Sequence, residues 1–201
     1  MPALLLKNNM LTPIDLGRDI AAEVNKDGQN NAENQLWLST HLIGDNTGEN
    51  ISAKNRSYNE MTAVYWAWKN LDQLGNPEYI GFMHYRRQYI FDDHLVAQFK
   101  GAPFEAPDSQ FRINTLSSSS TELLFNEKII ANALDGVDVL LPRSTHWDFT
   151  VYEQYLAASG KAHQIRDLDI TLQVIKEEFA DYYPTVKAYM NGNTHYWWNM
   201  F

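Results

Sequence analysis

Residues 45–87 read DNTGENISAKNRSYNEMTAVYWAWKNLDQLGNPEYIGFMHYRR, and no other part of the chain packs so many unusual side chains into so short a span. A polar, Asn-rich loop comes first, a segment crowded with aromatic residues follows, and a short apolar run then ends in a His, a Tyr and two Arg. We predict that these three parts are a loop, a helix and a strand. Together they are expected to form the floor of a binding site, which the rest of the chain supports.

The middle of this stretch has the pattern of a helix over about residues 58–73. Five apolar residues recur at helical spacing and predict its buried face: Met61, Val64, Tyr65, Trp68 and Leu71. Ser57 and Glu60 fit a capping box, in which each side chain bonds the backbone N–H of the other residue. Gly75 is a typical helix stop, and Pro77 prevents continuation.

Several residues of this helix have both a structural and a functional interpretation. The capping box favours a structural role for Glu60, with a catalytic carboxylate as the alternative. Tyr65 and Trp68 lie on the apolar stripe, which favours the core over a platform for sugar. The residues off the stripe are candidates for lining a cleft or for covering the surface: Tyr58, Trp66, Lys69 and Asn70.

The apolar run at residues 79–85 is typical of a short strand buried on both faces. Arg86 and Arg87 follow at its carboxyl end, where open α/β sheets bind ligands. A guanidinium group offers paired donors in one plane, which suits a phosphate or a carboxylate. Alternation along a strand places His84 and Arg86 on one face, and Tyr85 and Arg87 on the other. One Arg is therefore expected to bind a ligand while the other forms a structural ion pair.

The run DNTGENIS-x-KN-x-SY-x-E-x-T-x-x-YWAWKN, followed by YIGFMHYRR, resembles the DUF4422 family, and the resemblance extends over about residues 13–201. It implies a glycosyltransferase of bacterial capsule, exopolysaccharide or O-antigen synthesis. The implied reaction moves a sugar from a nucleotide-diphosphate donor to a saccharide or lipid-linked saccharide acceptor. Some members of the family are associated with galactofuranose transfer.

The resemblance implies a GT-A-like, Rossmann-related α/β fold, with a mixed, mostly parallel sheet flanked by helices. Residues 13–17 (PIDLG) resemble a segment that follows the first strand in the family, and residues 199–201 resemble the start of a later strand. We therefore predict a single glycosyltransferase-like domain over residues 1–201 that lacks the usual first strand and C-terminal part. Residues 25–35 and 100–120 are predicted to be loops, the second a long one.

Apolar periodicity predicts further helices at about residues 120–134, 149–159, 169–182 and 184–190. Residues 137–141 (VDVLL) predict a second buried strand, closed by Pro142. Polar residues just beyond it are second-tier site candidates: Arg143, His146 and Asp148. The family resemblance also draws attention to Tyr155 and His163, for which helix packing is the structural alternative.

Composition limits the classes of function. The 201 residues carry a formal net charge of −9, which argues against a nucleic-acid groove. The chain has no Cys, so disulfides and thiolate metal sites are excluded. No apolar run reaches the length of a membrane span. We predict a cytoplasmic protein, and the lipid-linked acceptors implied by the resemblance would bring it to the inner face of the membrane.

A cofactor is not required by the sequence. Asp92, Asp93 and His94 offer ligands for Mg²⁺ or Mn²⁺ shared with a nucleotide sugar, whereas an acidic surface turn is the favoured alternative. A metal-free site fits as well, because Arg side chains can neutralise a diphosphate leaving group.

For sugar transfer, we expect Arg86 to hold the diphosphate, with Arg87 as the second candidate. The candidates for the catalytic base are Asp45, Glu60 and His84. Side chains expected to contact the sugars are Asp45, Asn46, Asn50, Asn55, Tyr58, Trp66, Lys69 and Tyr85.

Two other classes of function stay open. A non-catalytic saccharide- or partner-binding domain would keep the Trp, Tyr and Asn contacts without responding to nucleotide. A glycoside hydrolase needs two carboxyl groups about 5–9 Å apart, which Asp45 and Glu60 could supply. In a hydrolase, however, the Arg pair would have no purpose.

Overall fold

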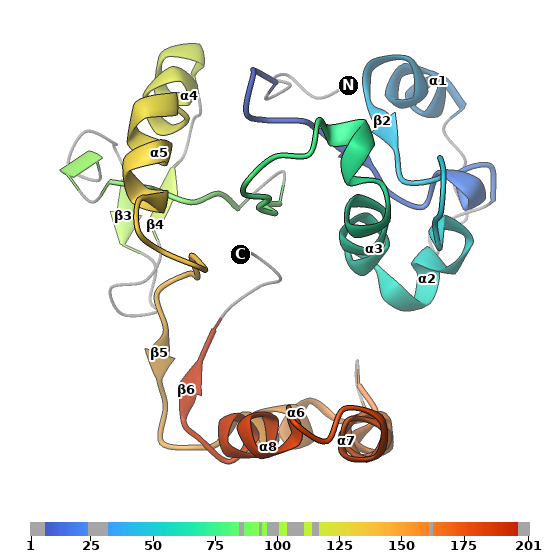
Figure 1. The fold of residues 1–201 in the computed structure, drawn as a ribbon, viewed down its shortest axis with the longest axis vertical. Coiled ribbons are helices and arrows are strands. Elements are labelled where there is room, and N and C mark those ends of the chain that lie inside the picture. The colour runs from blue at the N-terminus through green and yellow to red at the C-terminus, as the bar shows by residue number, and fades with distance from the viewer. Residues whose placement is uncertain are drawn as a thin grey trace. The chain divides into compact units, whose positions relative to one another are not determined.

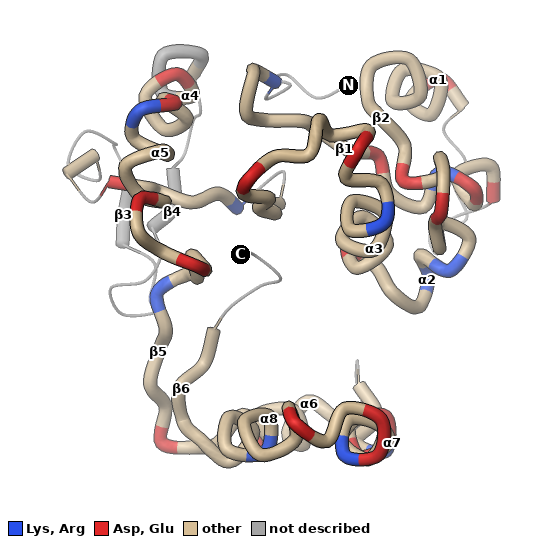
Figure 2. The backbone as a smooth tube through the Cα atoms, in the orientation of Figure 1, with Lys and Arg blue, Asp and Glu red and all other residues tan. Residues whose placement is uncertain are grey.

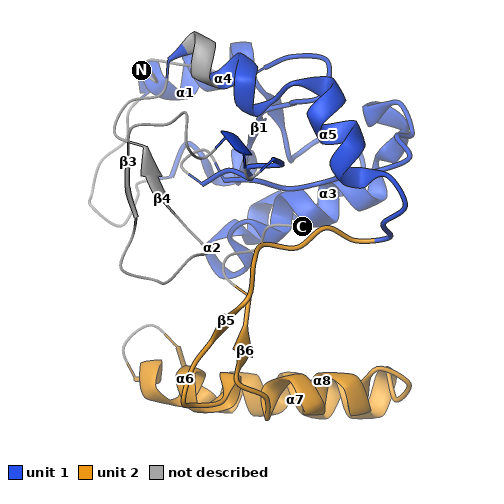
Figure 3. Cartoon of the chain, turned by 90° about the vertical axis from the view of Figure 1, so that its left-hand side faces the viewer, with its two compact units in different colours: residues 1–99, 115–138, 201 blue, residues 100–114, 139–200 orange. Residues whose placement is uncertain are grey.

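The computed structural model describes residues 7–23, 32–84, 87–92, 94–95, 101–103, 111–113, 117–160 and 163–196. The chain is mixed α/β (Figure 1). It divides into two compact units, shown in different colours in Figure 3. Unit 1 comprises residues 1–99, 115–138 and 201, and unit 2 comprises residues 100–114 and 139–200.

Unit 1 begins with two very short strands that run parallel. Strand β1 (Ile14–Asp15) pairs with β2 (Ile43–Gly44), and the 3₁₀ helix η1 (Arg18–Ile20) follows β1 directly. Helix α1 (Ala32–His41) leads into β2. The loop predicted over residues 25–35 is wrong at its end, because α1 begins at Ala32; residues 24–31 lie outside the described part of the chain. Helix-forming residues such as Ala and Glu outweigh the polarity of the segment there.

The predicted helix over residues 58–73 is broken into shorter pieces. The 3₁₀ helix η2 (Ser52–Lys54) leads into α2 (Asn55–Tyr58), and α3 (Met61–Lys69) is followed by η3 (Leu71–Leu74). The break between α2 and α3 falls at Asn59, whose φ of 47° is left-handed. Gly75 ends η3 in a left-handed conformation, as the sequence predicts.

The capping box at Ser57 and Glu60 was predicted wrongly. Ser57 lies inside α2 and is exposed, and Glu60 precedes α3 without a side-chain capping bond. The left-handed Asn59 turns the chain between the two residues, so their side chains cannot bond each other's backbone in the way a capping box requires.

The buried face of α3 also differs from the predicted one. Its buried residues are Thr62, Ala63, Trp66 and Ala67, whereas Trp68 is 64% exposed. Small side chains let this face pack closely under the polar loop of residues 45–50, and the Trp66 N–H finds a partner there. The prediction relied on hydrophobicity alone and therefore chose a different face of the helix as the buried one.

Unit 1 is completed by two helices near its C-terminal end. Helix α4 (Ser118–Leu124) and helix α5 (Glu127–Leu134) replace the single helix predicted over residues 120–134. The Asn126 side chain accepts a hydrogen bond from the Lys128 backbone N–H at 3.0 Å, so Asn126 caps the N-terminus of a new helix, α5. Buried apolar side chains of this unit are Ala63, Trp66, Ala67, Leu95, Leu124, Phe125 and Ile130.

Neither predicted buried strand forms within the described residues. Residues 79–84 are irregular up to a bridge at His84, and Tyr79 and Ile80 are each 39% exposed. Residues 137–141 are also irregular, with Val139 64% exposed. An apolar run becomes a central strand only when both faces are covered, and that condition is not met here.

The described residues of unit 2 form two short antiparallel ladders and three helices. Strand β3 (Gly101–Pro103) pairs with β4 (Phe111–Ile113), so the long loop predicted over residues 100–120 is wrong in part. Strand β5 (Thr145–His146) pairs with β6 (Thr194–His195). The helices are α6 (Val151–Ala158), α7 (Ile165–Glu178) and α8 (Tyr183–Met190).

The three helices of unit 2 match the predictions closely. Thr150 and Glu153 form a complete capping box at the start of α6. Pro184 lies in the first turn of α8, where its missing N–H costs nothing. Helix α7 begins and ends about a turn earlier than predicted.

The mostly parallel sheet is not found in the described part of the chain, where three separate two-stranded sheets occur and one of them, β1–β2, is parallel. Each ladder spans two or three residues, too few to build a broad sheet. Among the described helices, none is long and apolar enough to cross a membrane. Both units carry acidic and basic residues (Figure 2).

Candidate functional site

Asp45 is the centre of a buried polar network in unit 1. Its side chain is fully buried. One carboxylate oxygen accepts hydrogen bonds from the Gly17 backbone N–H at 2.8 Å and the Thr62 hydroxyl at 2.6 Å. The other accepts from the Arg18 backbone N–H at 3.2 Å and the Ser52 hydroxyl at 2.5 Å. The carboxylate therefore ties η1, η2 and α3 together, and four donors occupy it.

The structure explains why the PIDLG segment has a Gly at position 17. Gly17 has a φ of +64°, which side chains rarely adopt, and a Cβ there would collide with the Asn55 side chain. The neighbouring Arg18 side chain bonds Asp15 at 3.1 Å and the Leu42 carbonyl at 2.9 Å. Sequence reasoning missed this link between the start of the chain and Asp45, because the partners lie 28 residues apart.

The loop of residues 45–50 is clamped onto α3. The Trp66 indole N–H donates to both the carbonyl and the hydroxyl of Thr47 at 3.0 Å. The buried Asn70 amide donates to the Glu49 carbonyl at 2.9 Å. A Cβ at Gly48 would strike the Asn70 side chain. Trp66 is 2% exposed, so it packs in the core and is not placed to contact a sugar as predicted.

The three Asn residues predicted to bind sugar hydroxyls have partners within the protein. The Asn46 amide donates to Asp19 at 2.9 Å. The Asn50 amide donates to the Gly48 carbonyl, and its oxygen accepts from the Ser52 N–H. The Asn55 amide donates to the Asn59 carbonyl at 2.9 Å and the Thr62 hydroxyl at 3.0 Å. These bonds shape the loop and the start of α3.

Glu60 and His84, two of the residues predicted as catalytic, lie together. The distance from Glu60 Oε1 to His84 Nδ1 is 3.7 Å. The His84 side chain is 14% exposed and that of Glu60 is 41% exposed. His84 Nε2 is buried and has no hydrogen-bond partner among the described residues. A buried polar atom of this kind is costly unless a partner is supplied.

Arg87 is bonded to this His through the backbone. His84 and Arg87 exchange two backbone hydrogen bonds, at 3.0 and 3.2 Å. Tyr85 and Arg86, predicted to bind substrate, lie outside the described residues. Arg87, also predicted, is half-buried.

An exposed cluster occupies the outer face of α3. Glu49 accepts a hydrogen bond from the Tyr65 hydroxyl at 2.7 Å and pairs with Lys69 at 3.3 Å. The Lys69 ammonium lies 4.1 Å from the centre of the Trp68 ring. The Tyr65 bond lowers the pKa of Glu49, with a further contribution from Lys69, and the same bond raises the pKa of Tyr65. Of the predicted residues, Lys69 belongs to this cluster.

Tyr58 is exposed at the end of α2. Tyr65 and Trp68 were predicted to be core residues, and Trp68 is instead 64% exposed in the cluster formed by Glu49, Tyr65, Trp68 and Lys69. Exposed aromatic rings beside hydrogen-bonding groups have the amphipathic character that sugar rings require.

No group of three or more His, Asp or Glu side chains in the described residues is placed to hold a metal ion. Asp92 accepts a hydrogen bond from the His94 backbone N–H at 2.9 Å, as in an acidic turn, and Asp93 lies outside the described residues.

The second-tier candidates belong to unit 2. His146 Nδ1 lies 3.1 Å from the Thr194 hydroxyl, and the Tyr155 ring stacks on His163 with centroids 4.8 Å apart. His195, which was not predicted, is 2% exposed. Its ring nitrogens lie 3.3 Å from Gln154 Oε1 and 3.2 Å from the Phe149 carbonyl, so it holds β6 against α6. These contacts fit packing roles.

The comparisons place the chain in a family. The model of DUF4422, a domain of unknown function, matches residues 2–201, and the chain belongs to this family. It is also similar to the structure described as the WbbM bifunctional glycosyltransferase in its apo form, with a TM-score of 0.72 and 27% sequence identity. That similarity covers 99% of this chain and 31% of the WbbM chain. No curated protein matches.

Proposed function

We propose that this chain transfers a sugar from a nucleotide-diphosphate donor to a saccharide acceptor. The similarity to a bifunctional glycosyltransferase over 99% of the chain supports this class of reaction. The observation that carries the proposal is the pairing of Glu60 with His84, a residue whose backbone is bonded to that of Arg87.

In the proposed mechanism, His84 accepts the proton of the acceptor hydroxyl at Nε2. Glu60 lies 3.7 Å from the other ring nitrogen, so its carboxylate stabilises the imidazolium that forms. Arg86 and Arg87 neutralise the charge that develops on the departing nucleoside diphosphate. No step passes through a metal ion. Asp45 acts in the scaffold, because four hydrogen bonds occupy its carboxylate.

Finer parts of the proposal rest on the family resemblance. We propose a GT-A-like arrangement and a role in bacterial surface polysaccharide synthesis. A hexose donor, including galactofuranose, and a lipid-linked acceptor at the inner face of the membrane are part of the same proposal.

The proposal predicts nucleotide binding that depends on the arginine pair. Titration calorimetry with nucleotide sugars should show binding by the wild type. Arg86→Ala and Arg87→Ala should each weaken it about tenfold or more, because a hydrogen bond to a charged group contributes about 1.5–3 kcal/mol. Arg166→Ala on α7 is the matched control, since Arg166 is exposed and lies in unit 2. Equal affinity in the wild type and the three variants would show that the two arginines do not bind the nucleotide.

A non-catalytic saccharide-binding module is the second candidate. The exposed cluster of Glu49, Tyr65, Trp68 and Lys69 favours it, because that cluster offers aromatic surface and polar groups, and its one carboxylate is engaged by Tyr65 and Lys69. Saccharide binding that is lost in Trp68→Ala, with no response to any nucleotide, would favour this candidate over the enzyme.

A further inference from the structure

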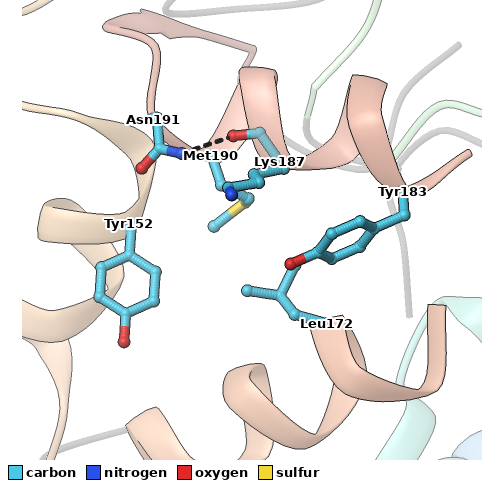
Figure 4. Close-up of a pocket in the computed structure, with 6 residues that line it drawn as sticks. All are labelled: Tyr152, Leu172, Tyr183, Lys187, Met190 and Asn191. Atoms are coloured by element: carbon cyan, nitrogen blue, oxygen red, sulfur yellow. Dashed lines mark hydrogen bonds between the residues drawn. The ribbon is translucent and has the colours of Figure 1, made fainter. Parts of the chain in front are cut away.

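Unit 2 contains a cavity of its own, between α6, α7 and α8 (Figure 4). Its volume is about 220 Å³, below the ~300–1,000 Å³ of pockets for drug-sized ligands. A cavity of this size suits a single small ring. Its lining residues are Tyr152, Leu172, Tyr183, Lys187, Met190 and Asn191.

Three polar groups at this cavity have capacity for a ligand. The Lys187 ammonium forms no hydrogen bond or ion pair with the described residues, and neither does the Tyr183 hydroxyl, which Figure 4 shows directed toward the space between the helices. The Asn191 amide N–H donates to the Lys187 carbonyl at 2.9 Å, which fixes the side chain and leaves its oxygen as an acceptor. Donor and acceptor groups therefore stand on one helix and its C-terminal turn.

The remaining lining is apolar or aromatic. Leu172 and Met190 contribute aliphatic surface, and Tyr152 contributes a ring. The Tyr152 hydroxyl donates to Asp169 at 2.9 Å, and this bond raises the pKa of Tyr152. The ring is held by that bond, so it offers a fixed aromatic surface rather than a mobile one.

We propose that this cavity binds one neutral sugar ring of a saccharide. A sugar ring has apolar C–H surface, which packs on Tyr152 and Leu172, and a rim of hydroxyls that both donate and accept. Lys187 would donate to ring hydroxyls, and Asn191 would accept from them. The inference is drawn from the lining of unit 2 and does not depend on the sugar-transfer chemistry proposed for unit 1.

Two other ligand classes fit less well. A phosphate needs several charged or backbone donors. Lys187 is the one cation among the residues that line the cavity, and the nearby Lys176 ammonium lies over the Tyr183 ring, 5.9 Å from its centre. A purely apolar ligand would leave the Lys187 ammonium and the Asn191 oxygen unused at the rim of the cavity, where both residues are exposed. A neutral polyhydroxylated ring satisfies both kinds of lining.

The test is a titration of the whole chain, followed by NMR, with the methyl glycosides of galactose, glucose and mannose, and separately with inorganic phosphate. Binding of at least one glycoside is expected, with resonance shifts at Tyr183, Lys187 and Asn191. Lys187→Met should weaken that binding about tenfold, and Tyr183→Phe should weaken it less. Lys128→Met is the matched control, because Lys128 is an exposed residue of α5 in unit 1.

Saturable shifts that disappear in Lys187→Met but persist in Lys128→Met would support the site. No shift with any of the three glycosides, shifts confined to unit 1, or a response to phosphate alone would overturn it. His84→Gln should leave glycoside binding in unit 2 unchanged while it impairs transfer. Loss of one property without the other therefore separates this inference from the proposed function.

Discussion

At the scale of single residues, the polar motif of residues 45–70 is largely a scaffold. Sequence reasoning would first assign ligand binding to Asp45, Asn55 and Asn70. Each of these side chains instead forms hydrogen bonds with other groups of the protein. A sequence shows which groups can bond but not whether their partners lie in a ligand or 28 residues away along the chain.

Asp45→Asn should destabilise unit 1 by about 3 kcal/mol, because the amide nitrogen would face donors and leave buried groups unsatisfied. Urea unfolding followed by circular dichroism measures the change. Asp19→Asn is the control: Asp19 accepts one exposed hydrogen bond from Asn46, and the expected change is within about 0.5 kcal/mol. Equal losses in the two variants would show that the Asp45 network is not a stabilising centre.

Tyr89 makes the stability of the folded chain depend on pH in the alkaline range. Burial raises the pKa of its phenol from 10.0 to about 12, and the hydroxyl has no partner among the described residues. The folded state thus holds this proton more tightly than the unfolded chain. The stabilisation is fully present below pH 10 and is lost as the pH rises toward about 12.

Tyr89→Phe should remove the part of the loss in unfolding free energy that comes from Tyr89. Denaturant unfolding at pH values below and above 10 measures this change. A smaller dependence should persist, because hydrogen bonds to Glu49 and Asp169 raise the pKa of Tyr65 and Tyr152. A pH profile identical to that of the wild type would contradict the assigned burial of Tyr89.

At the scale of elements, the sequence predicted the helices of unit 2 well, whereas it missed the breaks in the helices of unit 1 and predicted strands poorly. Helical periodicity and Pro184 located α6 and α8 to within about two residues. The apolar runs at residues 79–85 and 137–141 carry no period that separates a buried strand from an irregular segment. Whether such a run forms a strand depends on which other elements pack against it, and the local sequence does not show this.

The cap observed at Thr150 and the cap predicted at Ser57 can be compared directly. Thr150→Ala should cost about 1 kcal/mol, because the Thr150 hydroxyl accepts from the Glu153 N–H at 3.1 Å. Ser57→Ala should cost almost nothing, since Ser57 is exposed inside α2 and caps no helix. Thermal unfolding of both variants measures the difference. A larger loss in Ser57→Ala would restore the capping box predicted from the sequence.

At the scale of the whole molecule, the two units differ in their interiors. Every fully apolar side chain that is buried among the described residues belongs to unit 1. In unit 2 the buried side chains of the described part are the polar residues Thr145 and His195. Less buried apolar surface means less stabilisation.

Amide hydrogen exchange should therefore be faster in α6, α7 and α8 than in α3. Exchange followed by mass spectrometry on peptides from each helix measures this. The expected order follows from local opening, which needs less free energy where few apolar contacts are broken. Equal protection of α3 and α7 would show that unit 2 is stabilised as strongly as unit 1.

The most direct test of the central claim is an assay of sugar transfer by the whole chain. Nucleotide sugars and saccharide acceptors are mixed with the wild type, Glu60→Gln and His84→Gln, and both the new glycosidic bond and the released nucleoside diphosphate are measured. The account predicts turnover by the wild type and a loss of about a hundredfold or more in His84→Gln, within the range for general base catalysis. Wild-type turnover that both substitutions leave unchanged, or saccharide binding without any transfer, would contradict it.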